Sequence, residues 1–425
     1  MMGRRLLCLV SAVVASASMW FYADCIFVPR QVMQQTRDQT PRGNLSDLYP
    51  RWLGARELLL HRRNPYGDDI TRESQIGYYG RPLDASRPTD PQDREAFAYP
   101  VYVVFLLAPF VRLPFQSVQW TFHWVLIALT LLSAWLWLRA LRWRLPWAET
   151  LACAVLLSSS VPGLQAIKLQ QLTLLVAALL AASAAAVVGR QLVLAGILLA
   201  LSTIKPQLAW PLVLWLLLWT LGEWQLRRRL AISFVATMLL LVAGGQQLLP
   251  GWLPMFVNAL RQYHQYTHNL SVLDADLGFL LGRIFAAFAF LASAWRLWPL
   301  RKEAAGGPGF GRALALTMAL TVLIVPMIAP YNQVLLFPSV MSLARGGRAS
   351  QPRSLRFAYV ACTAALALPW LASLSLTAAY FVASPSLAMA GWKLPFLTTF
   401  SFPLLLFGLM IAQPRPSLAE QPSAL

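Results

Sequence analysis

Residues 46–67 read SDLYPRWLGARELLLHRRNPYG, a largely polar stretch that follows one apolar run and precedes about ten more. The whole chain has 425 residues, of which 58% are hydrophobic and 12% charged, and its mean hydropathy is +0.55. Such a composition is typical of a chain embedded in lipid. The sequence therefore predicts an all-α integral membrane protein that forms a single polytopic domain over residues 1–425.

Apolar runs long enough to cross a hydrocarbon core of roughly 30 Å recur along the chain. They lie at residues 5–23, 117–139, 150–166, 171–189, 230–249, 277–298, 312–328, 357–381 and 394–412. Shorter runs, interrupted by prolines, lie at 99–113, 191–204, 208–222 and 333–344. Broken backbone is tolerated at membrane depth when it is packed inside protein. We expect residues 99–113 to dip into the membrane without spanning it.

Lys and Arg gather in alternate connections between these runs. One set of connections holds Arg4, Arg5, Arg139, Arg142, Arg144, Arg190, Arg227 to Arg229, Arg296, Arg301, Lys302, Arg312, Arg345, Arg348, Arg353 and Arg356. The opposite set holds few cations. Because cytoplasmic loops keep positive charge, this pattern predicts about twelve spans with both termini cytoplasmic. We expect a multi-pass protein of a bacterial inner membrane.

The net charge of +18 does not indicate a nucleic-acid partner, because the cations are spread over connections and form no basic domain. Anionic headgroups of the lipid bilayer are the expected partner. The four cysteines have no metal-ligand spacing, and three of them lie in apolar runs, so neither a disulfide nor a metal is expected.

The one long polar segment, residues 24–98, is expected to form a large first non-cytoplasmic loop. It holds eleven of the seventeen acidic residues of the chain. Residues 47–63 within it have an apolar side that includes Trp52 and Leu53, and a polar side that includes Arg51 and Arg56. This pattern predicts an amphipathic helix lying in the membrane interface.

Polar residues at the outer edge of the predicted bundle are functional candidates, because ionisable groups near a membrane are costly. Together they suit transfer of a sugar from a lipid-linked phosphate, which needs a base, cations for the phosphate and readers of sugar hydroxyls. Asp47 is the expected base, and Lys205, Lys168 and Arg283 are the expected phosphate ligands. The other candidates for substrate binding are Gln207, Gln171, His264, His268, Asn269, Asn332, Gln333, Tyr66 and Asn64.

Each candidate also has a structural interpretation. Ser46 or Asp47 could cap the following helix. Lys205 and Lys168 could extend to the membrane interface from helix ends. The histidines could lie on a solvated face, and Asn332 and Gln333 could satisfy the backbone at a helix start.

The order of several motifs resembles glycosyltransferase family 87, the polyprenol-phosphate-mannose-dependent mannosyltransferases of the GT-C class. These motifs are DLYPRWLGARELL at 47–59, NPYG at 64–67, AYPVYVVFLLAPFVRLP at 98–114, LQQLTLLVAALL at 169–180, LSTIKPQLAWPLVL at 201–214 and, more loosely, YTHNLSVLDADLG at 266–278. The resemblance covers most of the chain to about residue 225. Its most specific elements are the spacing from Asp47 to NPY and the KPQ interruption.

The resemblance implies a GT-C-like helical bundle with its active site at the non-cytoplasmic face and a polyprenyl-phosphate donor of mannose. It implies an aspartate base in the first loop, which corresponds to Asp47, and no requirement for a metal or other cofactor. The expected reaction is an inverting transfer to the hydroxyl of an acceptor, which could be a glycolipid, an oligosaccharide or a protein. The paired acidic residues of some GT-C relatives are absent at Asp47, and Asp68 and Asp69 match them imperfectly.

Two other classes of protein fit the same composition. A transporter or flippase of lipid-linked sugars, or a catalytically inactive lipid-binding relative, would also surround a lipid-facing cavity with polar groups. The clustering of polar residues at one edge favours an enzyme over a transporter. A polysaccharide polymerase or ligase would place its largest external loop later in the chain.

Overall fold

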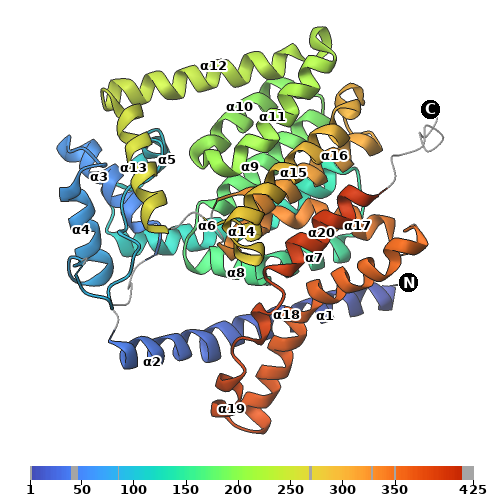
Figure 1. Cartoon of the computed structure of the whole chain (residues 1–425), viewed down its shortest axis with the longest axis horizontal. Helices are drawn as coiled ribbons and strands as arrows, with labels where there is room; N and C mark the ends of the chain where they lie inside the picture. The colour runs from blue at the N-terminus through green and yellow to red at the C-terminus, as the bar shows by residue number, and fades with distance from the viewer. Residues whose placement is uncertain are drawn as a thin grey trace.

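The computed structural model describes residues 2–39, 46–84, 86–267, 270–326, 329–348 and 351–413. Within these ranges the secondary structure is helical and there is no β-strand. Figure 1 shows the helices around a central group that includes α9, α11 and α16, with α12 along one side and α1 and α2 along the opposite side. The predicted all-α class is confirmed.

Six helical segments in the described chain are long and apolar enough to cross a membrane. They are Arg5–Asp38, Phe115–Ala140, Trp224–Leu248, Phe279–Lys302, Arg353–Val382 and Pro385–Ala412. The first joins α1 (Met2–Phe21), the π-helix η1 (Tyr22–Phe27) and α2 (Val28–Asp38), and the next two are α6 (Phe115–Ala140) and α12 (Trp224–Leu248). The last three comprise α15 (Phe279–Leu297) with η4 (Pro299–Lys302), η6 (Arg353–Leu355) with α18 (Arg356–Val382), and α19 (Pro385–Ala390) with η7 (Leu394–Phe396) and α20 (Ser401–Ala412).

A seventh segment is broken. The predicted run 150–166 forms α7 (Trp147–Ser159) and α8 (Val161–Lys168), which meet at an angle of 61°. Ser160 leaves the helical conformation with ψ 153°, and its Oγ accepts a hydrogen bond from the backbone N–H of Gly163 at 3.1 Å. This bond caps the new helix α8 and so stabilises the bend.

Several shorter apolar helices fill the centre of the molecule. They are α9 (Thr173–Val188), α10 (Leu192–Leu201) with η3 (Ser202–Ile204), α11 (Pro206–Gly222) and α16 (Pro308–Ile324). At about 1.5 Å per residue they are shorter than a hydrocarbon core of roughly 30 Å. By length and composition, six helical segments of the described chain could cross a membrane, or seven if the bent pair is one span. The predicted number of about twelve is not confirmed.

Residues 99–113 contain two short helices, α5 (Val103–Leu107) and η2 (Ala108–Phe110). Val101, Val103, Val104 and Leu107 in this segment are fully buried. A five-residue helix is too short to cross a membrane alone. That residues 99–113 dip into the membrane stays a prediction.

The first loop contributes α3 (Tyr49–His61) and α4 (Asp68–Tyr79). Trp52, Leu53 and Leu58 of α3 are buried in the main hydrophobic core, and the Trp52 indole N–H donates to the Phe110 carbonyl at 3.1 Å. Glu57 of α3 is also buried, so polar as well as apolar positions of this helix face protein. Placement of α3 in the membrane interface stays a prediction.

The remaining elements follow α12 and α16. They are α13 (Trp252–Thr267), α14 (Val272–Leu277), η5 (Pro330–Leu336) and α17 (Phe337–Gly346). In Figure 1, α13 runs from the end of α12 toward α3 and α5. Residues of the first loop and of the second half of the chain are therefore neighbours.

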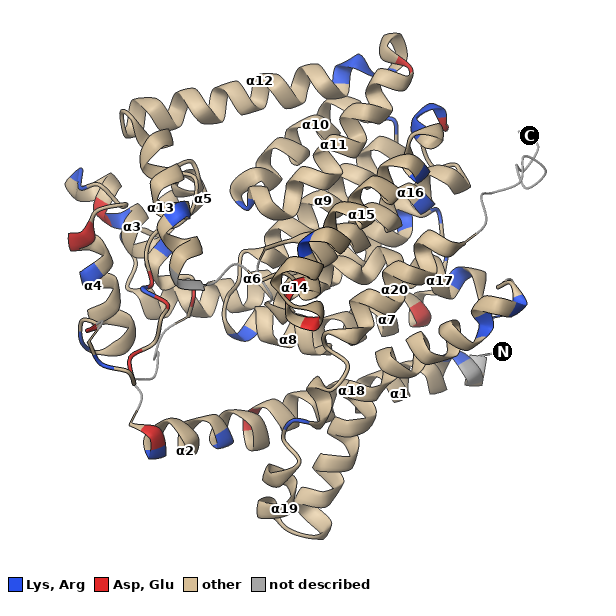
Figure 2. Ribbon diagram, viewed as in Figure 1, with Lys and Arg blue, Asp and Glu red and all other residues tan. Residues whose placement is uncertain are grey.

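The predicted basic connections lie together. Figure 2 shows Lys and Arg gathered at the right-hand end of the molecule, where α1 begins and α20 ends. Arg345 donates to the Leu141 carbonyl at 2.7 Å, and Arg227 donates to the carbonyls of Trp219 and Arg301, also at 2.7 Å. Connections that are far apart in the sequence thus share one end of the bundle.

We expect Arg227→Ala to destabilise the protein by about 3 kcal/mol, because it leaves several buried carbonyl groups without a donor. Arg227 is 4% exposed and also donates to the Glu303 carbonyl at 2.9 Å. Thermal unfolding in detergent, followed by tryptophan fluorescence, measures the effect. The exposed neighbour Arg228, substituted in the same way, is the matched control. Equal midpoints for the two variants would contradict this role of Arg227.

Candidate active site

Asp47 joins the first loop to the bundle. Its backbone N–H donates to the Leu169 carbonyl at 3.1 Å, just after α8. Its carboxylate accepts hydrogen bonds from the Gln171 side-chain amide and, at 3.4 Å, from the Tyr78 hydroxyl. No side chain caps α3, whose N-cap residue is Leu48. The carboxylate is therefore held by side chains from distant elements, and the interpretation of Asp47 as a helix cap is not supported.

Lys205 lies at a break in the apolar helices. Its backbone (φ −122°, ψ 80°) separates η3 from α11, and Pro206 begins the new helix. Its Nζ donates to Gln171 Oε1 at 2.7 Å and to Thr173 Oγ1 at 2.8 Å. Only 4% of Lys205 is exposed, so its ammonium group is enclosed by the protein and does not reach the surface. Gln171 thus connects Lys205 directly to Asp47.

A second cation, Arg51, lies beside the same network. It is one helical turn after Asp47 and donates to the Asp47 carbonyl at 2.5 Å. Its guanidinium carbon is 4.9 Å from the centre of the Tyr99 ring, and Lys205 Nζ is 5.7 Å from that ring. Lys205 Nζ is also 5.3 Å from the Tyr331 ring. Two cations from different parts of the chain therefore meet at one tyrosine.

The Arg51 guanidinium has hydrogen-bonding capacity to spare. Its Nε is buried and has no hydrogen-bond partner among the residues that the structure describes. A buried donor of this kind is costly unless a ligand satisfies it. A guanidinium beside an ammonium is suited to an anion with several oxygens, such as a phosphate.

Two further carboxyl groups lie near Asp47. Burial raises the pKa of Glu95 well above its usual value, and the charges of Asp93 and Asp47 raise that pKa further. Glu95 is 6% exposed and accepts a hydrogen bond from Tyr79 at 3.4 Å. When Glu95 is protonated, one negative charge fewer lies beside Arg51 in this group. A smaller negative charge beside this cation favours binding of an anionic ligand.

The structure brings together some of the predicted residues. Gln171 and Lys205 are in the network of Asp47, and Asn332 Oδ1 accepts from the Thr173 hydroxyl at 3.2 Å. Tyr66 is one step away, because its hydroxyl donates to the Tyr99 carbonyl at 2.7 Å. Asn64 Oδ1 in turn accepts from the Tyr66 backbone N–H at 3.0 Å.

Other predicted residues have different partners. Lys168 forms an ion pair with Asp24 of η1, and its Nζ is 5.2 Å from the Trp20 ring. Arg283 of α15 forms an ion pair with Asp274 at 3.5 Å. These contacts do not join either cation to the Asp47 network.

Gln207 is half-buried in the first turn of α11, and His264 lies next to Tyr263 on α13. His268 and Asn269 lie outside the described residues.

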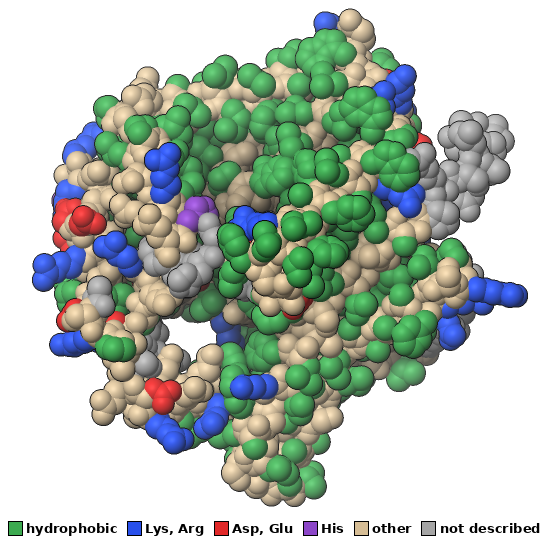
Figure 3. Space-filling model, viewed as in Figure 1, with side chains coloured by type: hydrophobic (Ala, Val, Ile, Leu, Met, Phe, Trp, Pro, Cys, Tyr) green, Lys and Arg blue, Asp and Glu red, His purple; other side chains and the backbone are tan. Residues whose placement is uncertain are grey.

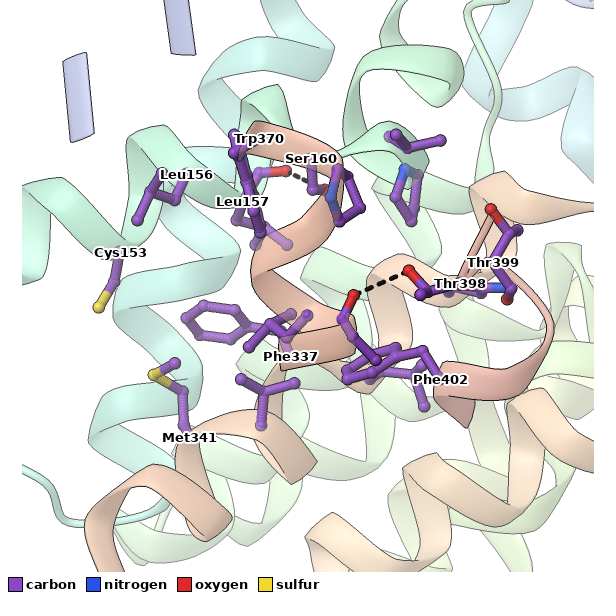
Figure 4. A pocket seen from close by; sticks show the side chains of 18 residues that line it. Cys153, Leu156, Leu157, Ser160, Phe337, Met341, Trp370, Thr398, Thr399 and Phe402 are labelled. Carbon is purple, nitrogen blue, oxygen red and sulfur yellow. Dashed lines mark hydrogen bonds between the residues drawn. The ribbon is translucent and has the colours of Figure 1, made fainter. Parts of the chain in front are cut away.

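Gln333 borders an apolar cavity of about 200 Å³. Its side-chain amide donates to the Thr399 carbonyl at 2.6 Å. Figure 4 shows the cavity among Leu156, Phe337, Trp370 and Phe402, which come from α7, α17, α18 and α20. Consecutive residues of η5 therefore contact the polar network and the apolar cavity.

Sequence reasoning missed Arg51, Tyr99, Thr173 and Glu95. The spacing of four residues between Asp47 and Arg51 was a signal, because such residues share one face of a helix. Glu95 had no comparable signal, since its approach to Asp47 depends on how the first loop folds.

Asp69, which matches a second acid of the GT-C relatives imperfectly, pairs with Arg63 at 2.8 Å. No group of three potential metal ligands occurs within the described residues.

Because the pKa of Glu95 is higher in the folded than in the unfolded protein, folding binds an extra proton at intermediate pH. The contribution of Glu95 to stability is fully present below its pKa in the unfolded protein, near 4.5. This contribution is lost as the pH rises through the pKa of Glu95 in the folded protein. We therefore expect unfolding midpoints measured from pH 4.5 to 8 to fall less steeply for Glu95→Gln than for the wild type. The exposed Asp38→Asn is the control, and parallel curves for wild type and Glu95→Gln would refute the assignment.

A model of glycosyltransferase family 87 matches residues 97–326, which is more than half of the chain. Among curated proteins and solved structures, no match to the chain was found. The matched segment includes Tyr99, Gln171 and Lys205, whereas Asp47 and Arg51 precede it. The apolar helices are those of a membrane protein. The chain therefore belongs to glycosyltransferase family 87 and is a membrane glycosyltransferase.

Proposed function

We propose that the protein transfers a sugar from a polyprenyl-phosphate donor to the hydroxyl group of an acceptor, with inversion at the anomeric carbon. The observation that carries this proposal is the meeting of Arg51 and Lys205 at the Tyr99 ring, beside Asp47. These groups supply the two requirements of the reaction, which are a stabilised phosphate leaving group and a base. Mannose as the sugar follows from the family resemblance.

In this proposal the donor phosphate binds between the two cations. Arg51 offers its free Nε–H, and Lys205 is held in position by Gln171 and Thr173. Charge on the phosphate increases as its bond to the sugar breaks. Cations fixed before the reaction stabilise this charge without reorganising. In this proposal cations of the protein bind the phosphate, and the reaction uses no metal or other cofactor.

Asp47 acts as the general base. As the acceptor oxygen attacks the anomeric carbon, its proton moves to the Asp47 carboxylate and the bond between that carbon and the phosphate oxygen breaks. The products are the glycosylated acceptor and polyprenyl phosphate. Hydrogen bonds from Gln171 and Tyr78 orient the carboxylate for this step.

The lipid chain of the donor is proposed to occupy the apolar cavity beside Gln333. The cavity is lined mainly by apolar side chains such as Leu157, Met341 and Phe402. The cavity and the polar network meet at consecutive residues of η5, which supports the proposal that the lipid chain and the phosphate belong to one ligand. A hydrocarbon chain gains free energy by leaving water for such a lining.

We further propose that the shorter apolar helices are also embedded in the membrane, which brings the number of crossings to about twelve. The basic end of the bundle would face the cytoplasm together with both termini, since cytoplasmic loops keep positive charge. The Asp47 network would then face the opposite side of a bacterial inner membrane. The acceptor is a glycolipid, an oligosaccharide or a protein on that side.

Asp47→Asn should lower the rate of sugar transfer by about 10² to 10⁴-fold, because it removes the base. The assay uses membranes with radiolabelled mannose on a short-chain polyprenyl phosphate, and lipid and protein extracts as acceptors. Asp38→Asn, on the exposed end of α2, is the matched control. Equal transfer by wild type and Asp47→Asn would remove Asp47 from the mechanism. Absence of product from the wild type with several donor sugars would reject the donor and favour transport.

Arg51→Gln should lower kcat/KM by about 10² to 10³-fold through loss of leaving-group stabilisation. Arg56→Gln on the same helix, whose guanidinium stacks 5.3 Å from the Trp52 ring, should keep near wild-type activity. We compare the two variants by their steady-state rates and by their unfolding midpoints. Similar losses in the two variants would show that Arg51 has no specific role.

A further inference from the structure

A second cavity lies between the first loop and α13, and the proposed reaction does not use it. Its volume is about 210 Å³, well above the roughly 10–15 Å³ that one water molecule requires. The loop contributes Asn64, Tyr66 and Arg94, and α13 contributes Asn258 and Gln262. Unlike the cavity beside Gln333, this one is lined mainly by polar groups.

The polar lining has the chemistry of a carbohydrate site. Side-chain amides both donate and accept hydrogen bonds, as sugar hydroxyls do. Asn258 and Gln262 are one helical turn apart, so their amides lie on the same face of α13, and both are exposed. Aromatic side chains are also present, because the Tyr66 and Phe97 rings meet edge to face at 5.3 Å. A small number of polar groups around aromatic surface is typical of a site for a small ligand.

The cavity is next to the Asp47 network. The Tyr66 hydroxyl donates to the Tyr99 carbonyl, and the Tyr99 ring is the one that Arg51 and Lys205 approach. On α13, Tyr263 follows Gln262 directly and interacts electrostatically with Arg51 and Asp93. The first loop and α13, which line the cavity, thus also contact the proposed active site. The proposed phosphate ligands Arg51 and Lys205 do not line the cavity.

We infer that this cavity is a saccharide-binding subsite, and that it holds a sugar unit of the acceptor adjacent to the unit that reacts. The inference rests on the proposed function for its link to the acceptor. Binding of a saccharide by Asn258, Gln262 and Asn64 follows from the cavity itself. The acceptor is therefore a glycan or glycolipid with at least two sugar units.

The test uses the full chain in detergent and two measurements. Saturation-transfer NMR detects binding of methyl α-mannoside, methyl α-glucoside and methyl α-galactoside without any need for catalysis. The transfer assay gives separate KM values for the donor and for manno-oligosaccharide acceptors. The double variant carries Asn258→Ala and Gln262→Ala. Both positions are exposed, and alanine is a good helix former, so α13 should remain folded. Arg261→Gln, an exposed neighbour that does not line the cavity, is the control.

We expect the double variant to lose the binding signal of at least one methyl glycoside. Its KM for acceptors of two or more sugar units should rise at least tenfold, with kcat and donor KM unchanged. Failure of all three glycosides to bind the wild type, or equal binding by the double variant, would overturn the inference. A rise in donor KM alone would overturn assignment to the acceptor. Binding that depends on Asn258 and Gln262, in a wild type without transferase activity, would support the saccharide site and reject the proposed function.

Discussion

The structure around the candidate site depends on burying the ammonium group of Lys205. A buried charge is costly unless it is hydrogen-bonded and compensated. Gln171 and Thr173 supply the hydrogen bonds, and the Tyr99 and Tyr331 rings make cation–π contacts with the ammonium group. These four partners come from the beginning of α9, the segment before α5 and the beginning of η5. One charge therefore fixes the relative positions of elements that are far apart in the sequence.

The backbone next to this network is also unusual. Gln170 and Glu95 have φ values of 46° and 52°, in the left-handed region that side chains with a Cβ rarely adopt. Gln170 turns the chain between α8 and α9, so that Gln171 reaches both Asp47 and Lys205. Glu95 turns the end of the first loop into the buried segment at Tyr99. Such conformations cost of order 1 kcal/mol each and are common where a functional geometry must be held.

The sequence predicted the parts of the fold that depend on local composition. Apolar runs gave the approximate positions of α1, α6, α12, α15 and α18, and the alternation of cations placed the connections of Arg139, Arg227, Arg301 and Arg345 at one end. The bend at Ser160 was missed, because the run 150–166 is apolar throughout and a single capping hydroxyl decides where the helix restarts. The number of spans stays a prediction, since length alone does not distinguish a short spanning helix from a buried one.

For the candidate site, sequence reasoning found Asp47, Gln171, Lys205 and Asn332 as separate polar residues at helix ends. It could not find the hydrogen bonds that join them, because these depend on tertiary packing. Arg51 was assigned to a water-facing side, since periodicity does not show which side of α3 the bundle covers. Lys168 was a reasonable phosphate ligand by position, but its charge is compensated by Asp24.

The 3₁₀ helix η5 has a thermodynamic consequence. Asn332 contacts the polar network through Thr173, and the next residue, Gln333, borders the apolar cavity. In the proposed function a phosphate binds at the first place and a lipid chain at the second, so a ligand that restricts η5 at one place would lower the entropic cost of binding at the other. By linkage this effect would be reciprocal, so the proposed lipid chain would strengthen the binding of the phosphate as much as the phosphate strengthens the binding of the chain. A donor that carries both parts would gain from this cooperativity, whereas a free phosphate or a free hydrocarbon would not.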